Sequence, residues 1–253
     1  MANNKQTVSL LRKNKQEQVA VLQELGFTNV TATTKASLFP IYVKWANGLL
    51  DCTIAVNRLS DGRAFYFSKE EWILLPQATK AQFLIRGIRL RSHGMSFVMA
   101  ISALTGAPWG PASDIARVPN YQGSGELYSD RKAEEYNQII LSSISNGNGD
   151  TAIELCRDYK AFTQEIDGRE DTSTWVMGTV AHYMEVQRYR KEIDDCMAAA
   201  LGEGYRTPRN TIMTCLEYDA TKIWCVTLSS GYVYYDYNKT STSYYYLPIS
   251  IEA

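Results

Sequence analysis

The segment IRGIRLRSHGMSFVMAI, residues 85–101, alternates apolar and polar side chains on both sides of a glycine-containing turn. Residues 85–91 and 96–101 are expected to be short strands, and Ser92-His93-Gly94 is expected to join them as a tight hairpin in which glycine supplies a positive φ. Because Ile88-Arg89-Leu90-Arg91 alternates cleanly, one face of this sheet is expected to be wet or to face a partner.

Further short strands flank this hairpin. Runs of β-branched and aromatic residues between turn residues predict strands at 41–45, 52–57 and 63–67. One helical turn interrupts them, because Ser68 and Glu71 have the S-x-x-E spacing of a capping box. Residues 35–105 are therefore predicted to form a small β-rich domain.

The rest of the chain mixes helices and strands. A loop rich in Gly, Pro and Ser occupies residues 106–130, and a domain boundary is placed at its start. Apolar residues spaced at i, i+3 and i+4 predict helices at 134–144, 151–162 and 180–201. Strands are predicted at 212–217, 222–228, 232–237 and 244–251, with hairpin turns at 229–231 and 238–240.

These patterns together predict an α+β fold in three parts. Residues 1–34 would be an N-terminal tail with a short helix, residues 35–105 the β-rich domain, and residues 106–253 a mixed α/β domain that ends in a sheet of β-hairpins.

The composition is that of a folded protein with little net charge. Of the 253 residues 45% are hydrophobic, and 26 Lys and Arg against 27 Asp and Glu give a formal charge of −1. A charge near zero argues against nucleic-acid binding by bulk electrostatics, which needs a basic face. No apolar run approaches the roughly 18 residues of a membrane helix, and the first residues lack the apolar core of a signal peptide.

Cysteine and histidine do not suggest a metal site. The five cysteines are odd in number and contain no C-x-x-C pair: Cys52, Cys156, Cys196, Cys215 and Cys225. Buried thiols in a reducing compartment are therefore expected, and no zinc site or disulfide framework.

One stretch matches a nucleotide-binding pattern. Residues 147–152, GNGDTA, fit the G-x-G-x-x-A pattern of dinucleotide-binding turns. The residues before it are polar and helix-like, and the strands that follow come in hairpins. A loop closed by Asp150 or Thr151 as a helix N-cap is the favoured interpretation.

No nucleophile and base occur at a spacing typical of a catalytic pair. His93 lies in a hairpin turn and His182 in a helix, where a polar or partly buried histidine is the favoured interpretation. The chain is not expected to be an enzyme or to hold a cofactor. An enzyme is kept as a third hypothesis, which a metal or cofactor bound near His182 or Cys225 would revive.

The N-terminal 34 residues carry a basic cluster followed by apolar residues at helical spacing. A short amphipathic helix that docks on another protein is expected, with a frayed tail as the alternative. The candidate anchoring residues are Leu10, Leu11, Arg12, Lys13, Lys15, Val19 and Leu22.

Residues 106–252 resemble a known domain in the order of their landmarks. The resemblance rests on Trp109-Gly110, on residues 175–179 (WVMGT), 211–218 (TIMTCLEY) and 224–231 (WCVTLSSG), and on Lys239 and Leu247-Pro248-Ile249. In this order they are similar to the C-type-lectin-like domain of bacterial surface and phage proteins, which is distantly similar to formylglycine-generating enzymes. The residues that this resemblance marks as defining the fold are Trp109, Trp175, Trp224, Gly231 and Pro248.

The polar positions of that domain are not kept. Met177-Gly178 stands in place of Leu-Pro, and residues 214–217 read TCLE in place of Ser-Ser-Thr-Glu. The paired catalytic cysteines of formylglycine-generating enzymes cannot be placed, and the Glu-Pro-Asn or Gln-Pro-Asp calcium motif of sugar-binding C-type lectins is missing. The resemblance therefore implies a scaffold and neither of those two activities.

A second resemblance lies in the β-rich part. Residues 67–72 (FSKEEW) with residues 88–100 (IRLRSHGMSFVMA) are similar to virion proteins of the crAss-like tailed phages of gut Bacteroidales. This implies a head fibre or capsid decoration protein on the capsid surface, made in the cytoplasm of the bacterial host. Its partners would be capsid or other virion proteins and further copies of the chain, as a dimer or a trimer.

Tyrosine supplies 17 of the 29 aromatic residues, and many lie near the C-terminus. Since residues i and i+2 of a strand share a face, Tyr232 and Tyr234 are expected to form one patch and Tyr235 and Tyr237 the other. One patch would pack on the helices, and the other would meet a neighbouring subunit or a host surface glycan. Core packing is the alternative for half of the candidate contact residues, which are Tyr232, Tyr234, Tyr235, Tyr237, Tyr244, Tyr245 and Tyr246.

The leading hypothesis is therefore a non-enzymatic virion protein that is attached by its N-terminus and projects the lectin-like domain. The alternative is a glycan-binding adhesin that is not part of a virion.

Overall fold

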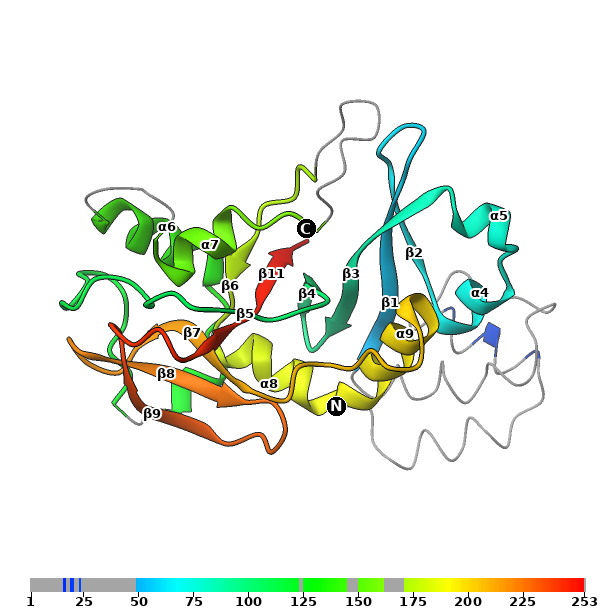
Figure 1. Cartoon of the computed structure of the whole chain (residues 1–253). Coiled ribbons are helices and arrows are strands. Elements are labelled where there is room, and N and C mark those ends of the chain that lie inside the picture. The colour runs from blue at the N-terminus through cyan, green and yellow to red at the C-terminus, as the bar shows by residue number, and fades with distance from the viewer. Residues whose placement is uncertain are drawn as a thin grey trace.

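Two β-sheets, one antiparallel and one mixed, with helices between and beside them, make up the described part of the chain (Figure 1). A computed structural model describes Gln16, Val19, Ala20 and Gln23 and residues 49–122, 125–144, 150–161 and 171–252. The expected mixed α+β class is confirmed. The expected N-terminal tail and the strand at 41–45 lie outside the described residues, apart from the four named ones.

The larger sheet, sheet A, has the strand order β2-β1-β3-β4-β11-β6. Its strands are β1 (Leu49–Arg58), β2 (Ala64–Phe67), β3 (Phe83–Ser92), β4 (Met95–Met99), β6 (Val176–Met177) and β11 (Pro248–Ile251). The hairpin between β3 and β4 is confirmed, and its turn uses His93 and Gly94 at φ 48° and 77°. Both residues lie in the left-handed region that such a turn requires.

A β-bulge interrupts the pairing of β1 with β3. Ala55 pairs with Gly87 whereas Val56 pairs with Ile85, so Arg86 is the extra residue. The next residue, Gly87, lies against the backbone of β4, the neighbouring strand in the sheet. A Cβ at Gly87 would be 2.2 Å from the carbonyl oxygen of Met99, so only glycine fits this approach.

The expected helical turn after β2 is present as α4 (Lys69–Leu74), which α5 (Gln77–Lys80) follows. The Ser68 side chain accepts from the Glu71 N–H, and the Glu71 carboxylate accepts from the Ser68 N–H. This reciprocal capping box is the one that the sequence predicts. It places Trp72 in the core, with its ring 5.7 Å from that of Phe67.

The smaller sheet, sheet B, has the strand order β5-β10-β7-β8-β9. Its strands are β5 (Leu104–Thr105), β7 (Thr211–Glu217), β8 (Lys222–Thr227), β9 (Val233–Asn238) and β10 (Tyr245–Tyr246). The turn at residues 229–231 joins β8 to β9, with Gly231 at φ 78°. The hairpin expected at residues 238–240 is wrong, because β10 pairs with β5 and β7 and does not pair with β9.

The strand expected at residues 244–251 is divided between the two sheets. β10 belongs to sheet B, and β11, two residues later, pairs with β4 and β6 in sheet A. Sheet A therefore contains strands from both sides of the boundary expected between residues 105 and 106, and so does sheet B through β5. The two ranges share their sheets and do not each form one of their own.

The helices of the second half are η2 (Gly125–Tyr128), α6 (Ala133–Ser143), α7 (Ala152–Arg157), α8 (Val180–Arg188) and α9 (Arg190–Leu201). The single helix expected at 180–201 is two, since Tyr189 leaves the helical conformation at ψ 22°. The Arg190 guanidinium donates to the carbonyl oxygens of Leu228 and Ser229, which ties the start of α9 to the β8–β9 turn. α7 ends earlier than expected, at Arg157.

Helix α8 lies between the two sheets. The ring of His182 meets that of Phe97 in β4 edge to face at 5.2 Å, and the helix also packs on β7 and β8. The Tyr183 hydroxyl accepts from the Gly178 N–H and donates to the carbonyl oxygen of Leu247, the residue at which the chain passes from sheet B to sheet A.

A buried ion pair fixes the end of β9. The Lys239 ammonium contacts the Glu217 carboxylate of β7, and both side chains are fully buried. Lys239 also donates to the Ser113 carbonyl oxygen at 2.8 Å, and the Ile115 N–H donates to Glu217 at 3.2 Å. Strand β9, strand β7 and the loop after β5 are therefore held at one point.

Gly87→Ala is expected to lower the free energy of unfolding by about 2 kcal/mol or more, because the new Cβ would overlap the Met99 carbonyl oxygen. Gly204→Ala is the matched control, since a Cβ there meets nothing within 4 Å. Urea unfolding of the two variants checks the prediction. Equal midpoints would contradict the close approach of β3 and β4.

Lys239→Met is expected to lower the free energy of unfolding by roughly 3–5 kcal/mol, because it leaves the Glu217 charge buried and without its counterion. Lys222→Met removes the half-buried partner of the exposed Asp236 and is expected to cost under about 1 kcal/mol. Lys239→Met combined with Glu217→Leu should regain part of the loss in urea unfolding. A Lys239→Met protein as stable as Lys222→Met would refute the role of the pair.

Candidate functional site

The tyrosines of β9 are sorted by a second β-bulge. Tyr234 pairs with Cys225 and Tyr237 pairs with Ile223, so Tyr235 and Asp236 together oppose Trp224. Cys225 and Ile223 are two residues apart and share a face of β8. Their partners Tyr234 and Tyr237 therefore also share a face, and the expected grouping of Tyr237 with Tyr235 is wrong.

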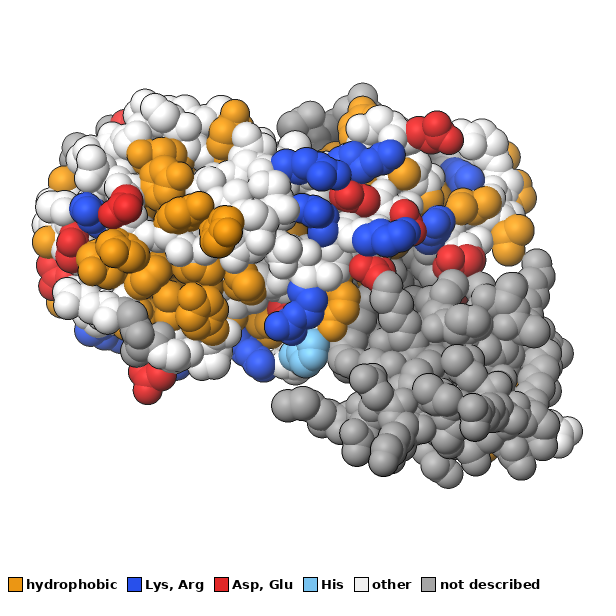
Figure 2. Space-filling model, turned by 90° about the horizontal axis from the view of Figure 1, so that it is seen from below, with side chains coloured by type: hydrophobic (Ala, Val, Ile, Leu, Met, Phe, Trp, Pro, Cys, Tyr) orange, Lys and Arg blue, Asp and Glu red, His pale blue; other side chains and the backbone are white. Residues whose placement is uncertain are grey.

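Four tyrosines form a continuous surface that we call the aromatic face: Tyr232, Tyr234, Tyr237 and Tyr244. The ring centroids of Tyr232 and Tyr234 lie 6.0 Å apart, those of Tyr234 and Tyr237 6.4 Å apart, and those of Tyr237 and Tyr244 4.1 Å apart. Tyr232 is 65% exposed and Tyr234 40%. Figure 2 shows hydrophobic side chains gathered on the half of the surface to which β8 and β9 belong.

Tyr235 lies on the opposite face of the strand and is 42% exposed, so its ring contacts and not its exposure distinguish it from Tyr234. Its ring stacks on that of Tyr218 at 4.1 Å and meets the edge of Trp224 at 5.4 Å. The Trp224 indole N–H donates to the carbonyl oxygen of Tyr121. In the part of the chain that the structure describes, the rings that contact Tyr235 belong to a loop residue and a strand residue. The expected packing of one tyrosine patch on helices is therefore not seen for Tyr235.

The remaining candidate tyrosines belong to β10. Tyr246 is buried, and its hydroxyl donates to the Thr105 carbonyl oxygen at 3.3 Å. Tyr245 is half-buried and pairs with Thr105 and Ile212. Tyr246 therefore packs in the core, which is the alternative expected for half of the candidate contact tyrosines.

The aromatic face lies at an edge of its sheet. β9 ends the strand order of sheet B, and no described strand pairs with its outer side. Edge strands offer unpaired backbone N–H and C=O groups to another chain. Tyrosine adds a flat apolar ring and a hydroxyl that donates and accepts hydrogen bonds, which suits contacts with protein or sugar surfaces.

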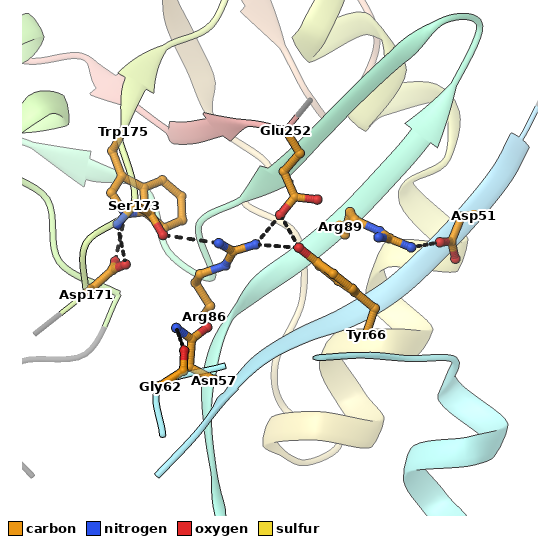
Figure 3. A network of polar contacts seen from close by, with 10 residues as sticks. All are labelled: Asp51, Asn57, Gly62, Tyr66, Arg86, Arg89, Asp171, Ser173, Trp175 and Glu252. Carbon is orange, nitrogen blue, oxygen red and sulfur yellow. Dashed lines mark hydrogen bonds and ion pairs between the residues drawn. The ribbon is translucent and has the colours of Figure 1, made fainter. Parts of the chain in front are cut away.

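A cluster of polar side chains lies on the face of sheet A that carries Arg89 (Figure 3). The Arg86 guanidinium reaches Ser173 at 3.2 Å through one nitrogen, and Glu252 and Tyr66 through another. The Tyr66 hydroxyl donates to Glu252 at 2.6 Å. The bulge turns Arg86 toward these partners, so the C-terminal end of the chain is tied to β2 and β3.

Arg89 and Asp51 complete this cluster. We call it the arginine network, and its members are Asp51, Tyr66, Arg86, Arg89, Ser173 and Glu252. The Arg89 guanidinium pairs with Asp51 and lies 3.7 Å from the ring centre of Tyr66. Burial raises the pKa of Asp51 above its ordinary value, although Arg89 opposes that shift. Burial also raises the pKa of Tyr66, and the hydrogen bond to Glu252 adds to this.

The arginine network is charge-neutral and only partly satisfied. Two guanidinium groups face the two carboxylates of Asp51 and Glu252. Among the described residues, four buried side-chain polar atoms have no hydrogen-bond partner, all on strands of sheet A: Thr53 Oγ1, Asn57 Oδ1, Arg86 Nε and Arg89 Nε. On the face expected to be wet or to meet a partner, Arg89 is half-buried in the network and Arg91 is exposed. The network joins elements and offers no net charge to a ligand.

Ser92, His93 and Glu185 come together at the β3–β4 turn. The Ser92 hydroxyl donates to Glu185 at 2.6 Å and lies 2.7 Å from Nδ1 of His93, and Glu185 lies 3.0 Å from that same nitrogen. A serine–histidine–carboxylate relay needs the hydroxyl and the carboxylate on opposite ring nitrogens. This cluster lacks that arrangement, and Arg188 further pairs with Glu185 at 2.5 Å.

His182 is a buried structural residue. Its Nδ1 accepts from the Thr179 N–H at 3.3 Å and lies 2.8 Å from the Thr179 hydroxyl, so it closes the N-terminus of α8. Burial lowers the pKa of His182 to about 4, and Arg131 adds to this shift. The imidazole is therefore neutral at pH 7.

All five cysteines are described and buried, and none is in a disulfide. Burial raises the pKa of Cys156, Cys215 and Cys225. A reactive cysteine needs a lowered pKa, so these three thiols are not activated.

The helix N-cap expected in place of a nucleotide turn is confirmed. The Thr151 hydroxyl accepts from the Glu154 N–H, and Glu154 accepts from the Thr151 N–H.

Of the landmark residues of the lectin-like resemblance, the three tryptophans and Pro248 are buried, and Gly231 is half-buried. The indole N–H of Trp109 donates to the Thr214 carbonyl oxygen at 2.7 Å, and that of Trp175 donates to the Asp171 carboxylate at 2.7 Å. Pro248 begins β11, and a Cβ at Gly231 would lie 3.2 Å from Gln187 of α8.

Of the candidate anchoring residues, Val19 is described and is buried. Leu10, Leu11, Arg12, Lys13, Lys15 and Leu22 lie outside the described residues. Over the described ranges, no three metal-binding side chains come together, and no helix has both the length and the apolar character to cross a membrane.

Sequence reasoning missed the arginine network and the Lys239–Glu217 pair. The alternation at residues 88–91 identified Arg89, but Asp51 and Glu252 are far from it in the chain. No local pattern marks Lys239 as buried.

No protein-family model, curated protein or solved structure matches the chain.

His182→Gln is expected to remove a part of the acid sensitivity of the fold. His182 has a folded-state pKa of about 4 against about 6.5 when unfolded, so its contribution is present above pH 6.5 and is lost as the pH falls toward 4. The wild-type free energy of unfolding should fall by roughly 3 kcal/mol more than that of the variant between pH 7 and pH 4. Glutamine retains the capping geometry. Parallel stability curves in urea titrations at several pH values would refute a titrating His182.

Proposed function

We propose that this chain is a non-enzymatic structural protein of a bacteriophage virion, a head fibre or capsid decoration protein. Its N-terminus attaches to the capsid, and the lectin-like residues 106–252, which share both sheets with the rest of the chain, present sheet B outward for contact with a neighbouring subunit or the host surface. The aromatic face of sheet B is the contact surface.

The observation that carries this proposal is the exposure of the aromatic face. Tyr232, the residue before β9, is 65% exposed, and Tyr234, within this edge strand, is 40% exposed. Tyrosine is enriched in protein interfaces, and contiguous exposed aromatic surface marks sites of contact.

The resemblance of residues 67–72 and 88–100 to crAss-like virion proteins supports the phage assignment. The other polar clusters of the described chain favour a structural role as well. The arginine network and the Lys239–Glu217 pair cross-connect distant strands, and the histidine, serine and carboxylate at the β3–β4 turn are not arranged for proton relay. A dimer or a trimer would repeat the aromatic face around the assembly.

A glycan-binding adhesin outside a virion is the second candidate. The exposed rings favour it, because sugar rings stack on flat aromatic side chains. Binding of the full chain to a glycan array, lost on Tyr234→Ala, combined with absence from virions would support this candidate over the first.

Tyr232→Ala combined with Tyr234→Ala is expected to weaken self-association or ligand binding at least about tenfold, because the two rings provide the most exposed part of the aromatic face. Sedimentation velocity across a concentration series and the glycan array measure the two activities. The free energy of unfolding should change by less than about 2 kcal/mol, since Tyr232 is 65% exposed and Tyr234 40% exposed.

Tyr235→Ala is the matched control from the same strand. Its ring stacks on Tyr218 on the other face, so this variant should lose about 1 kcal/mol or more of stability and keep association and binding. If the double variant and Tyr235→Ala both keep association and binding, the strand is a fold element and the aromatic face is no contact surface.

A further inference from the structure

Two cysteines from distant parts of the chain meet beneath sheet A. The sulfur atoms of Cys52 in β1 and Cys196 in α9 lie 4.0 Å apart, although 144 positions separate the residues in sequence. The Cys196 sulfur also lies 3.6 Å from the Cys52 carbonyl oxygen. Both side chains are on the packed face between the strand and the helix.

The surrounding elements hold this pair in place. Helix α9 packs on β1 and β3 and also on α4, where Asp195, next to Cys196, pairs with Lys69. A disulfide has its sulfurs about 2.05 Å apart, so the two thiols must approach by roughly 2 Å. Side-chain rotation can supply most of this approach, because the two sulfurs are already in contact.

The other three cysteines are less suited to oxidation. Cys156, Cys215 and Cys225 lie fully inside the core, and burial raises the pKa of each thiol. The thiolate is the form that attacks an oxidant, so a raised pKa slows that reaction. Cys52 and Cys196 are the two cysteines with some solvent exposure, 4% and 3%.

We propose that Cys52 and Cys196 form a latent disulfide site, which closes when the protein meets a two-electron thiol oxidant. With a diazene oxidant such as diamide, one thiolate adds to the N=N bond, and the second thiol then displaces the hydrazine from that sulfur. One S–S bond forms, the two thiols lose two hydrogen atoms, and the diazene gains them as a hydrazine. The cross-link does not depend on the virion proposal.

The disulfide would tie β1 covalently to α9. The loop that it closes contains most of sheet A and the centre of the chain, so it restricts the unfolded state strongly. A rise in Tm of roughly 5–15 °C is expected on oxidation of the full chain.

The test oxidises the reduced, native full chain with diamide, blocks the remaining thiols, and maps peptides by mass spectrometry without reduction. The expected product is the Cys52–Cys196 cross-linked peptide with the loss of two hydrogen atoms, together with alkylated Cys156, Cys215 and Cys225. The rise in Tm should disappear when a phosphine reductant is added.

The wild-type peptide map alone decides the question, so the result does not depend on a variant that folds. Both cysteines still open to alkylation after oxidation, or a mixture of pairings among the five, would overturn the proposal. Cys196→Ala should lose both the cross-link and the oxidant-dependent rise in Tm, whereas Cys225→Ala should keep them.

Discussion

The ion pair between Lys239 and Glu217 lies where the chain leaves β9 and turns back through the molecule. Neither charge has access to solvent, and an uncompensated charge in that place would be costly, so each side chain requires the other. Lys239 also donates to the Ser113 carbonyl oxygen, and Glu217 accepts from the Ile115 N–H, so the loop after β5 is held by the same pair. With Lys239 held there, the following residues cross to the far side of β7, form β10 between β7 and β5, and enter sheet A as β11. This buried contact thus fixes the end of β9, from which the chain continues into the second sheet, while α8 and Tyr183 hold the two sheets together elsewhere.

Local signals allowed much of the fold to be predicted. The hairpin of β3 and β4, the capping box at Ser68 and the N-cap at Thr151 each depend on residues within a few positions of one another. The arrangement of sheets depends on distant pairs and was not predicted. A continuous β-pattern at residues 244–251 does not reveal that Leu247 separates two sheets, and a continuous helical pattern does not reveal the break at Tyr189.

The candidate site shows the same division. Composition and strand pattern identified the tyrosines of β9 as a surface feature, and Tyr232 and Tyr234 are exposed. Their grouping was wrong because a bulge adds one residue and moves Tyr237 to the other face. The two bulges, at Arg86 and opposite Trp224, have similar effects: each turns a polar or aromatic side chain toward partners that strict alternation would place on the opposite face. One bulge completes the buried arginine network, and the other extends the aromatic face.

The central claim is that this chain is a component of a virion. Quantitative peptide mass spectrometry of density-purified phage particles from the source culture tests it most directly. The account predicts that the chain is present at a fixed ratio to the major capsid protein across the particle fractions. Absence from the particles, with abundant chain in the infected cells, would contradict it.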